Sequence, residues 1–409
     1  MKNSRLRRRG LAIATSALNS LALPLLSPLF SLLVIRLASV ELWGEFVRVL
    51  VVVQLGAHIV VWGNKDYLLR EFSLAPAHLA RAWQTSLITR LSLFFVYLAV
   101  ISFLGYPPLR WIWLVLLSLS LVLVQAYEVF VIYRRDFAFS IAVELIHVSV
   151  AALALPALAL RGSLTLDGLI IVFSLSNVVK IGLFFLRYRA ASAAPLQGRF
   201  DLAHLRLAFP FFLLGFSGLL QSKIDLYCVN AFLSRREIGH YQVFINLMIY
   251  VQSVSGFILV PFVKSLYRLS YPAIRRISVR LFGAGLVITG AALPAAHLAL
   301  VYLYRFDLPA TFLLWGALFI LPIYFYLPII YALFKAGQPG MVIAFNFAGM
   351  AAGLLLNVWL LPRLGMLGGV VASAAVQWLL LLAYAVRSRV LRRELQEAEA
   401  HGVAVPELS

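Results

Sequence analysis

Apolar residues along the chain occur in blocks of about 20, and short polar segments separate one block from the next. A helix rises about 1.5 Å per residue, so a block of this length crosses the hydrocarbon core of a bilayer. The pattern predicts an all-α integral membrane protein with about twelve transmembrane helices. The expected spans cover residues 11–37, 42–62, 86–104, 111–132, 137–160, 166–186, 207–233, 239–267, 277–302, 311–333, 340–361 and 366–386.

The composition supports a membrane protein over a soluble one. Of the 409 residues, 63% are hydrophobic and 12% are charged, whereas about 25% of the residues of soluble domains are charged. The net charge of +19 might by itself suggest nucleic-acid binding. The basic residues lie mostly at the ends of the apolar blocks, however, so we expect no nucleic-acid partner. The only cysteine, Cys228, falls inside a predicted span, which excludes an intrachain disulfide and argues against a structural zinc site. We expect neither a metal nor a cofactor.

The distribution of Lys and Arg predicts the orientation in the membrane. Basic residues favour the cytoplasmic ends of spans, and this rule places both termini in the cytoplasm. The basic N-terminal run precedes an apolar block that is longer than the apolar region of a secretory signal, which has about 7–15 residues. We therefore expect this block to stay in the protein as its first span. The connections assigned to the outside are all short: 38–41, 105–110, 161–165, 234–238, 304–309 and 362–365.

An internal similarity divides the chain into two halves. Residues 39–46 resemble residues 234–241, with Ser39, Gly44 and Phe46 matching Ser234, Gly239 and Tyr241. A weaker similarity relates 167–168 to 367–368. We predict an N-terminal lobe over 1–190, a cytoplasmic linker over 191–206, a C-terminal lobe over 207–386 and a cytoplasmic tail over 387–409. An even number of spans per lobe makes the repeats parallel. Chance similarity between glycine-centred turns is the alternative.

Three segments resemble those of polysaccharide-export flippases, the Wzx-type O-antigen and lipid-linked oligosaccharide flippases of the multidrug/oligosaccharidyl-lipid/polysaccharide (MOP) exporter superfamily. The first segment is 39–46, a turn that follows the first span. The second runs from Pro210 through Asp225-Leu226-Tyr227 and residues 237–241 to Pro261. The third is a hairpin with Asn357, Leu360-Leu361-Pro362 and residues 365–369. The chain departs from the family pattern at Ser39, where glycine is frequent, and it is short for the family.

The resemblance implies two six-helix lobes around a central cavity lined by spans one, two, seven and eight. It also implies a location, the bacterial inner membrane, and a function, the translocation of a polyprenyl-pyrophosphate-linked oligosaccharide by alternating access during surface polysaccharide synthesis. The partners implied are membrane lipid, the lipid-linked glycan, and a polysaccharide polymerase with other assembly proteins.

Polar residues inside the spans are the candidate binding residues, because intramembrane polar groups are costly and face protein or water. Gln54 and His58 share one helical face, and Gln242 and Asn246 share another with Ser253. We expect these two faces to form walls of the cavity. Interhelical hydrogen bonding that only stabilises the helices is the alternative.

Asp225 is the leading candidate for an ion or proton site, and it shares a face with Gln221 and Ser217. Lys223 lies about 200° around the helix from Asp225, so we expect only one of the two to face a given cavity. Arg48 flanks the polar face of its span and is a candidate for the anionic head group or for pairing with Asp225. The alternatives are a structural ion pair between the lobes for Asp225 and snorkelling to the surface for Arg48.

Weaker candidates are Glu128, Glu144, His147, Lys180 and Lys223. Glu144 and His147 are three residues apart and are expected to pair with each other. Lys180 is expected to reach the cytoplasmic surface with its long side chain.

The motifs absent from the sequence exclude several functions. Phosphate-binding loops, H-E-x-x-H and G-x-G-x-x-G do not occur, so ATP hydrolysis, zinc proteolysis and dinucleotide chemistry have no support and we expect no enzyme. A membrane glycosyltransferase or polysaccharide polymerase would need a sizeable outward loop. All the outward connections expected here are short, so this enzyme class is the less favoured alternative. A multidrug exporter, coupled to an ion gradient and belonging to the same superfamily, is the main alternative. A scaffold without transport would leave the polar stripes unexplained.

Overall fold

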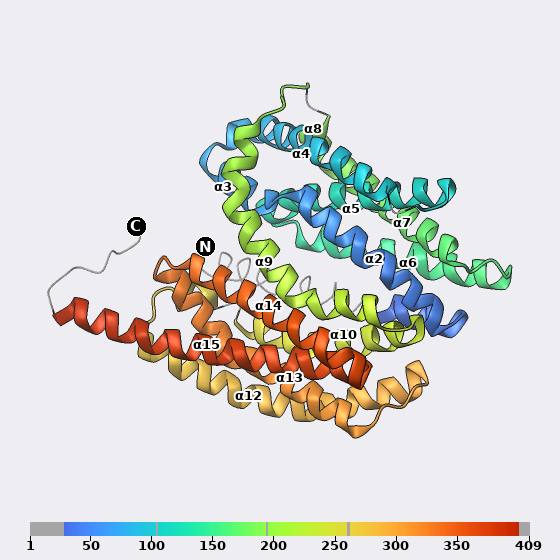
Figure 1. Ribbon diagram of the computed structural model, residues 1–409. Helices are drawn as coiled ribbons and strands as arrows, with labels where there is room; N and C mark the ends of the chain where they lie inside the picture. The colour runs from blue at the N-terminus through green and yellow to red at the C-terminus, as the bar shows by residue number, and fades with distance from the viewer. Residues whose placement is uncertain (1–27, 104, 194, 260–261, 401–409) are drawn as a thin grey trace, which may run out of the picture. The chain divides into compact units, whose positions relative to one another are not determined.

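The computed structural model describes residues 28–103, 105–193, 195–259 and 262–400, and all the regular elements within those ranges are helices (Figure 1). The elements are α2 (Val40–Val61), α3 (Asn64–Leu74), η1 (Pro76–His78), α4 (Leu79–Ser102), α5 (Pro108–Arg134), α6 (Phe137–Leu160), α7 (Leu166–Arg187), α8 (Arg189–Ser192), α9 (Leu202–Phe232), α10 (Arg235–Leu259), α11 (Val263–Leu266), α12 (Tyr271–Leu298), η3 (Ala299–Tyr304), α13 (Ala310–Lys335), α14 (Pro339–Leu364) and α15 (Met366–Ala400).

The all-α prediction is confirmed, and 11 helices within the described ranges are long and apolar enough to cross a membrane. These helices match the expected spans from the second to the twelfth, with ends that differ by several residues. The expected first span, 11–37, lies largely outside the described residues. Its described part forms the apolar helix Pro28–Leu37.

A helix, α3, occupies a segment that we expected to be a connecting loop. Two residues in the left-handed conformation, Trp62 with φ 48° and Gly63 with φ 66°, separate α3 from α2. At Gly63 an added Cβ would lie 2.3 Å from the backbone nitrogen of Phe212, so the close approach of α9 also requires glycine there. The charged residues of 64–74 concealed the helix, although Tyr67, Leu68 and Phe72 follow the helical spacing of a buried face.

The chain divides into two compact units at a boundary within the sequence of α9: the first unit ends at Phe216 and the second begins at Ser217. In the first unit α5 packs against α2, α3 and α7, and α6 packs against α7. In the second unit α13 packs against α10, α12 and α15, and α14 packs against α15. The boundaries of the lobes and of the 191–206 linker stay predictions.

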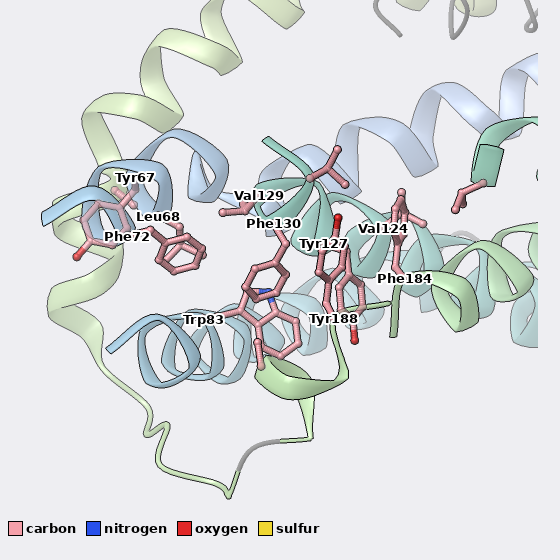
Figure 2. Close-up of a cluster of buried hydrophobic side chains, with 14 residues drawn as sticks. Tyr67, Leu68, Phe72, Trp83, Val124, Tyr127, Val129, Phe130, Phe184 and Tyr188 are labelled. Atoms are coloured by element: carbon pink, nitrogen blue, oxygen red, sulfur yellow. The ribbon is translucent and has the colours of Figure 1, made fainter. Parts of the chain in front are cut away.

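An aromatic core holds the first unit together at one end (Figure 2). Phe130 of α5 stacks on Phe72 of α3 at 5.8 Å between ring centroids and on Tyr188 at 5.3 Å. Trp83 of α4 lies 5.5 Å from Phe130 and donates its indole N–H to the carbonyl of Ala126 at 3.0 Å. Burial of large aromatic rings stabilises such a cluster strongly, and the three segments that carry Phe72, Trp83 and Tyr188 are thereby fixed to α5.

The two similar segments of the sequence begin two helices in the same way. The hydroxyl of Ser39 accepts from the backbone N–H of Leu42 at 3.1 Å and caps α2. Ser234 likewise accepts from the N–H of Glu237 at 3.4 Å, and the carboxylate of Glu237 accepts from the Ser234 hydroxyl at 2.7 Å. The second arrangement is a capping box. Ser39 and Ser234, which match in the sequence, therefore both cap the N-terminus of a helix, α2 and α10 respectively.

Candidate functional site

A polar cavity of about 120 Å³ lies inside the second unit, between α9, α10, α13, α14 and α15. Hydrophobic residues dominate these helices. A group of polar side chains at one place within them costs free energy and therefore marks a candidate functional site. The polar residues that line the cavity are Gln221, Ser222, Lys223, Asp225, Gln252, Asn357, Ser373 and Gln377.

Asp225 is the acidic group of this cavity, and only 7% of its surface is exposed. Its carboxylate accepts a hydrogen bond of 2.5 Å from the hydroxyl of Tyr241 on α10 and a further one from the side chain of Ser373 on α15. Tyr241 is fully buried, and its ring lies 2.9 Å from the position of a Cβ added at Gly369. The segments 234–241 and 365–369, both picked out from the sequence, thus meet at Asp225.

Lys223 also lines the cavity, so the expectation that Lys223 and Asp225 would face different surroundings was wrong. The two charges are close enough to interact electrostatically. The physical reason is the reach of the lysine side chain: four methylene groups carry the ammonium around the helix, whereas the angular argument follows only the Cα–Cβ direction. The cavity therefore holds one carboxylate and one ammonium group.

Four amide side chains also line the cavity, those of Gln221, Gln252, Asn357 and Gln377. Asn357 donates to the carbonyl of Gly353 at 2.8 Å, and its own Oδ1 is buried with no hydrogen-bond partner among the described residues. The side-chain oxygen of Gln377 accepts from Tyr326 at 2.7 Å, and Gln252 donates to the carbonyl of Phe319 at 3.3 Å. Oxygens of Asp225, Asn357 and Ser373 are thus available in one cavity, which suits a proton or a small hard cation.

A second group of charges lies in the first unit, where Lys180 of α7 forms an ion pair with Glu144 of α6. Their side chains are 13% and 12% exposed. The expected pairing of Glu144 with His147 was therefore wrong, as was the expectation that Lys180 reaches the surface. A neighbouring helix brings the flexible lysine to the carboxylate, which the sequence of one helix does not reveal. His147 and Glu128 lie within electrostatic reach of this pair.

A buried polar cluster in the first unit, centred on Arg90 of α4, was not predicted from the sequence. Arg90 is 1% exposed, and its Nε donates to the carbonyl and the hydroxyl of Ser86, both at 3.2 Å. Its two terminal nitrogens have no hydrogen-bond partner within the described part of the chain. Ser86 also bonds to Asn64 of α3, and His204 of α9 is buried within electrostatic reach. The signal available was a basic residue inside an apolar block.

The remaining sequence candidates do not line the Asp225 cavity. Arg48 and Gln54 of α2 are exposed, and both Gln242 and Asn246 of α10 are half-buried. His58 is half-buried, with its ring 6.2 Å from that of Phe216 within the first unit. The roles expected for these five residues stay predictions.

The fold is similar to that of solved membrane transporters. An inward-facing multidrug resistance transporter of the MATE family, in the MOP superfamily, matches with a TM-score of 0.63 and 10% identity over 93% of this chain and 99% of that chain. The lipid II flippase MurJ, in an inward closed conformation, matches at 0.59 with 14% identity over 91% and 87% of the two chains. An outward-facing MATE transporter matches at 0.59 with 13% identity over 94% and 96%.

These likenesses show the fold: the chain folds like the MATE and MurJ transporters. No protein-family model matches the sequence, and no curated protein matches it in sequence.

Proposed function

We propose that the protein is a membrane transporter that works by alternating access and translocates a lipid-linked oligosaccharide with a polyprenyl-pyrophosphate anchor. The observation that carries the transport part is the combination of a MOP-type fold over nearly the whole chain with a polar, charged cavity inside one unit. A purely structural helical bundle would gain nothing from this cavity, because intramembrane charges are expensive.

The charges support an anionic substrate over a cationic drug. Lys180 is paired with Glu144, and Lys223 lines the cavity beside Asp225. Arg48 of α2 and the buried Arg90 of α4 are two further basic groups within the helices. A guanidinium binds phosphate oxygens through two parallel hydrogen bonds, and an ammonium binds them as a point charge. Both groups suit a pyrophosphate. The three segments that resemble polysaccharide-export flippases favour the same substrate class.

Asp225 supplies the coupling in this proposal. The neighbouring ammonium of Lys223 competes with a proton or cation for the carboxylate. Loading and unloading Asp225 would then change the charge of the cavity and bias one conformational state over another, as required of any coupled transporter.

The test is complementation in a bacterial host from which the lipid-linked oligosaccharide flippase has been deleted. The expected result is restored surface polysaccharide with the wild-type chain and none with Asp225→Asn, at comparable abundance on immunoblots. Asp307→Asn is the matched control, because Asp307 is an exposed carboxylate in a short loop. Flippases are selective for their glycan, so hosts with several different glycans are needed.

The alternative is export of drugs, which the same strains can test after deletion of their own exporters. Resistance to cationic drugs that depends on Asp225, without restored polysaccharide in any host, would replace the proposed substrate while retaining transport. Purified protein in liposomes that moves neither class of compound, despite correct folding, would contradict the proposal as a whole.

A further inference from the structure

An arginine-lined groove of about 550 Å³ lies at the beginning of α12, well separated in sequence from the residues of the Asp225 cavity. Among the residues whose side chains the structure describes, four arginines and no acidic residue line it. The lining residues are Tyr271, Pro272, Arg275, Arg276, Val279 and Arg280 of α12 and Arg392 of α15. All four arginines are exposed, and none forms an ion pair with a residue whose side chain the structure describes, which leaves out 394–400.

The groove is a defined feature of the second unit, since two helices build it. Tyr271 is hydrogen-bonded to the side chain of Ser388 on α15, and both Arg275 and Arg392 lie within electrostatic reach of its hydroxyl. Arg392 is one helical turn beyond Ser388. The contact between Tyr271 and α15 therefore holds a cation of α15 opposite the cations of α12, and like charges repel unless an anion lies between them.

The same face of α12 continues as an apolar surface. Val279, Leu286 and Val287 are 55%, 50% and 74% exposed, and their spacing of seven and eight residues places them on one side of the helix. Gly283 and Gly290 lie on this side too, and a Cβ added at either would meet nothing within 4 Å. An exposed apolar track of this kind, on a helix long enough to span the membrane, suits acyl chains.

We propose that this groove binds the phosphate head group of an anionic phospholipid, with its acyl chains along the Val279–Leu286–Val287 face of α12. Arginine forks bind phosphate oxygens bidentately, and basic pockets at the cytoplasmic ends of transmembrane helices attract anionic lipid head groups. The beginning of α12 is the end that the positive-inside rule assigns to the cytoplasm. The exposed apolar face of α12 favours a lipid over free phosphate, because free phosphate would contact the arginines and leave the apolar face uncovered. This inference does not depend on the substrate proposed above.

The experiment measures thermal unfolding and lipid retention of the purified full chain in detergent. Short-chain dioctanoyl phosphatidylglycerol should raise the unfolding midpoint and survive as a bound species in native mass spectrometry. Dioctanoyl phosphatidylcholine and inorganic phosphate should do neither at the same concentration. In the variant Arg275→Gln/Arg276→Gln/Arg280→Gln, the apparent Kd for the anionic lipid should rise at least tenfold.

The matched control is Arg70→Gln/Arg81→Gln/Arg189→Gln, which removes the same charge from exposed positions of the first unit and should leave the Kd unchanged. A second variant, Leu286→Gln/Val287→Gln, keeps every arginine and should weaken binding of the lipid by disturbing the acyl track. Equal binding of the anionic lipid by the wild type and the arginine variant would overturn the proposal. So would equal stabilisation by inorganic phosphate, which would identify a free-anion site.

Discussion

Asp225 and Lys223 illustrate what a sequence says about single residues in a membrane. An intramembrane carboxylate in an otherwise apolar span was identifiable because its burial is costly unless water, a partner or a ligand compensates it. The structure adds Tyr241 and Ser373 as its hydrogen-bond donors. Neither donor follows from the sequence of α9, because each lies on a different helix. Lys223 was misjudged for a different reason, since the helical angle ignores the length of the side chain.

The first prediction concerns the function of Asp225. Asp225→Asn should abolish transport with little loss of protein, because the amide keeps the volume but can neither release a proton nor neutralise a cation. Tyr241→Phe removes only one hydrogen bond to the carboxylate and should reduce activity partially. Surface polysaccharide in the complementation host, read beside immunoblot abundance, measures both.

A structural role for the Lys223 and Asp225 charges would give a different pattern. Each single neutralisation would lower abundance, and Lys223→Gln/Asp225→Asn would recover both protein and activity. Full activity of Asp225→Asn at normal abundance would end the assignment of Asp225 to transport.

The second prediction concerns the Glu144–Lys180 ion pair, which we expect to stabilise the packing of α6 on α7. Its side chains are nearly buried, so either Glu144→Gln or Lys180→Gln should cost about 3–5 kcal/mol by leaving one charge unpaired. The double variant should recover most of this loss. Reversible unfolding in mixed micelles gives the coupling energy, and additive single effects would show that the pair contributes little.

At the scale of elements, the apolar blocks predicted the spans because each block carries its own signal. Segments whose stability comes from docking were harder to predict. The α3 helix is polar on its exposed side, and its buried face has a partner only once α5 is in place (Figure 2). Residues 195–201, part of the predicted 191–206 linker, lie along α4, which the sequence does not reveal. The side chain of Gln84 accepts from the backbone N–H groups of Gln197 and Gly198 at 2.9 and 3.2 Å.

The third prediction concerns this docked segment. An added Cβ at Gly198 would lie 2.6 Å from the Cβ of Gln84 and 2.7 Å from the backbone of α4, which cannot move easily. Gly198→Ala should therefore weaken docking by about 1–3 kcal/mol, and trypsin should cleave faster after Arg199, at least fivefold. Gly182→Ala is the control, since nothing lies within 4 Å of a Cβ added there. Equal cleavage rates in the two variants would contradict close docking of 195–201 on α4.

At the scale of the whole molecule, the similarity between 39–46 and 234–241 lies where backbone geometry demands particular residues. Ser39 and Ser234 cap α2 and α10, and a helix N-terminus accepts few alternatives. Apolar residues that face lipid are largely interchangeable, so the repeat that we predict would leave little sequence similarity between these caps. The same freedom explains how the fold can match MATE and MurJ structures at 10–14% identity.

The last prediction is the membrane orientation, which the fold leaves open because inverting the whole chain preserves all its internal contacts. The excess of Lys and Arg in alternate connections predicts that residues 187–206 are cytoplasmic and that 161–165 face outward. In a Cys228→Ser background, a cysteine at Ser163 should react with a membrane-impermeant maleimide added to intact cells. A cysteine at Ala193 should react only after permeabilisation. Both positions are exposed, so accessibility within the protein does not limit labelling. Labelling of Ala193→Cys in intact cells, with none at Ser163→Cys, would reverse the orientation and move the arginine groove of α12 to the outer leaflet.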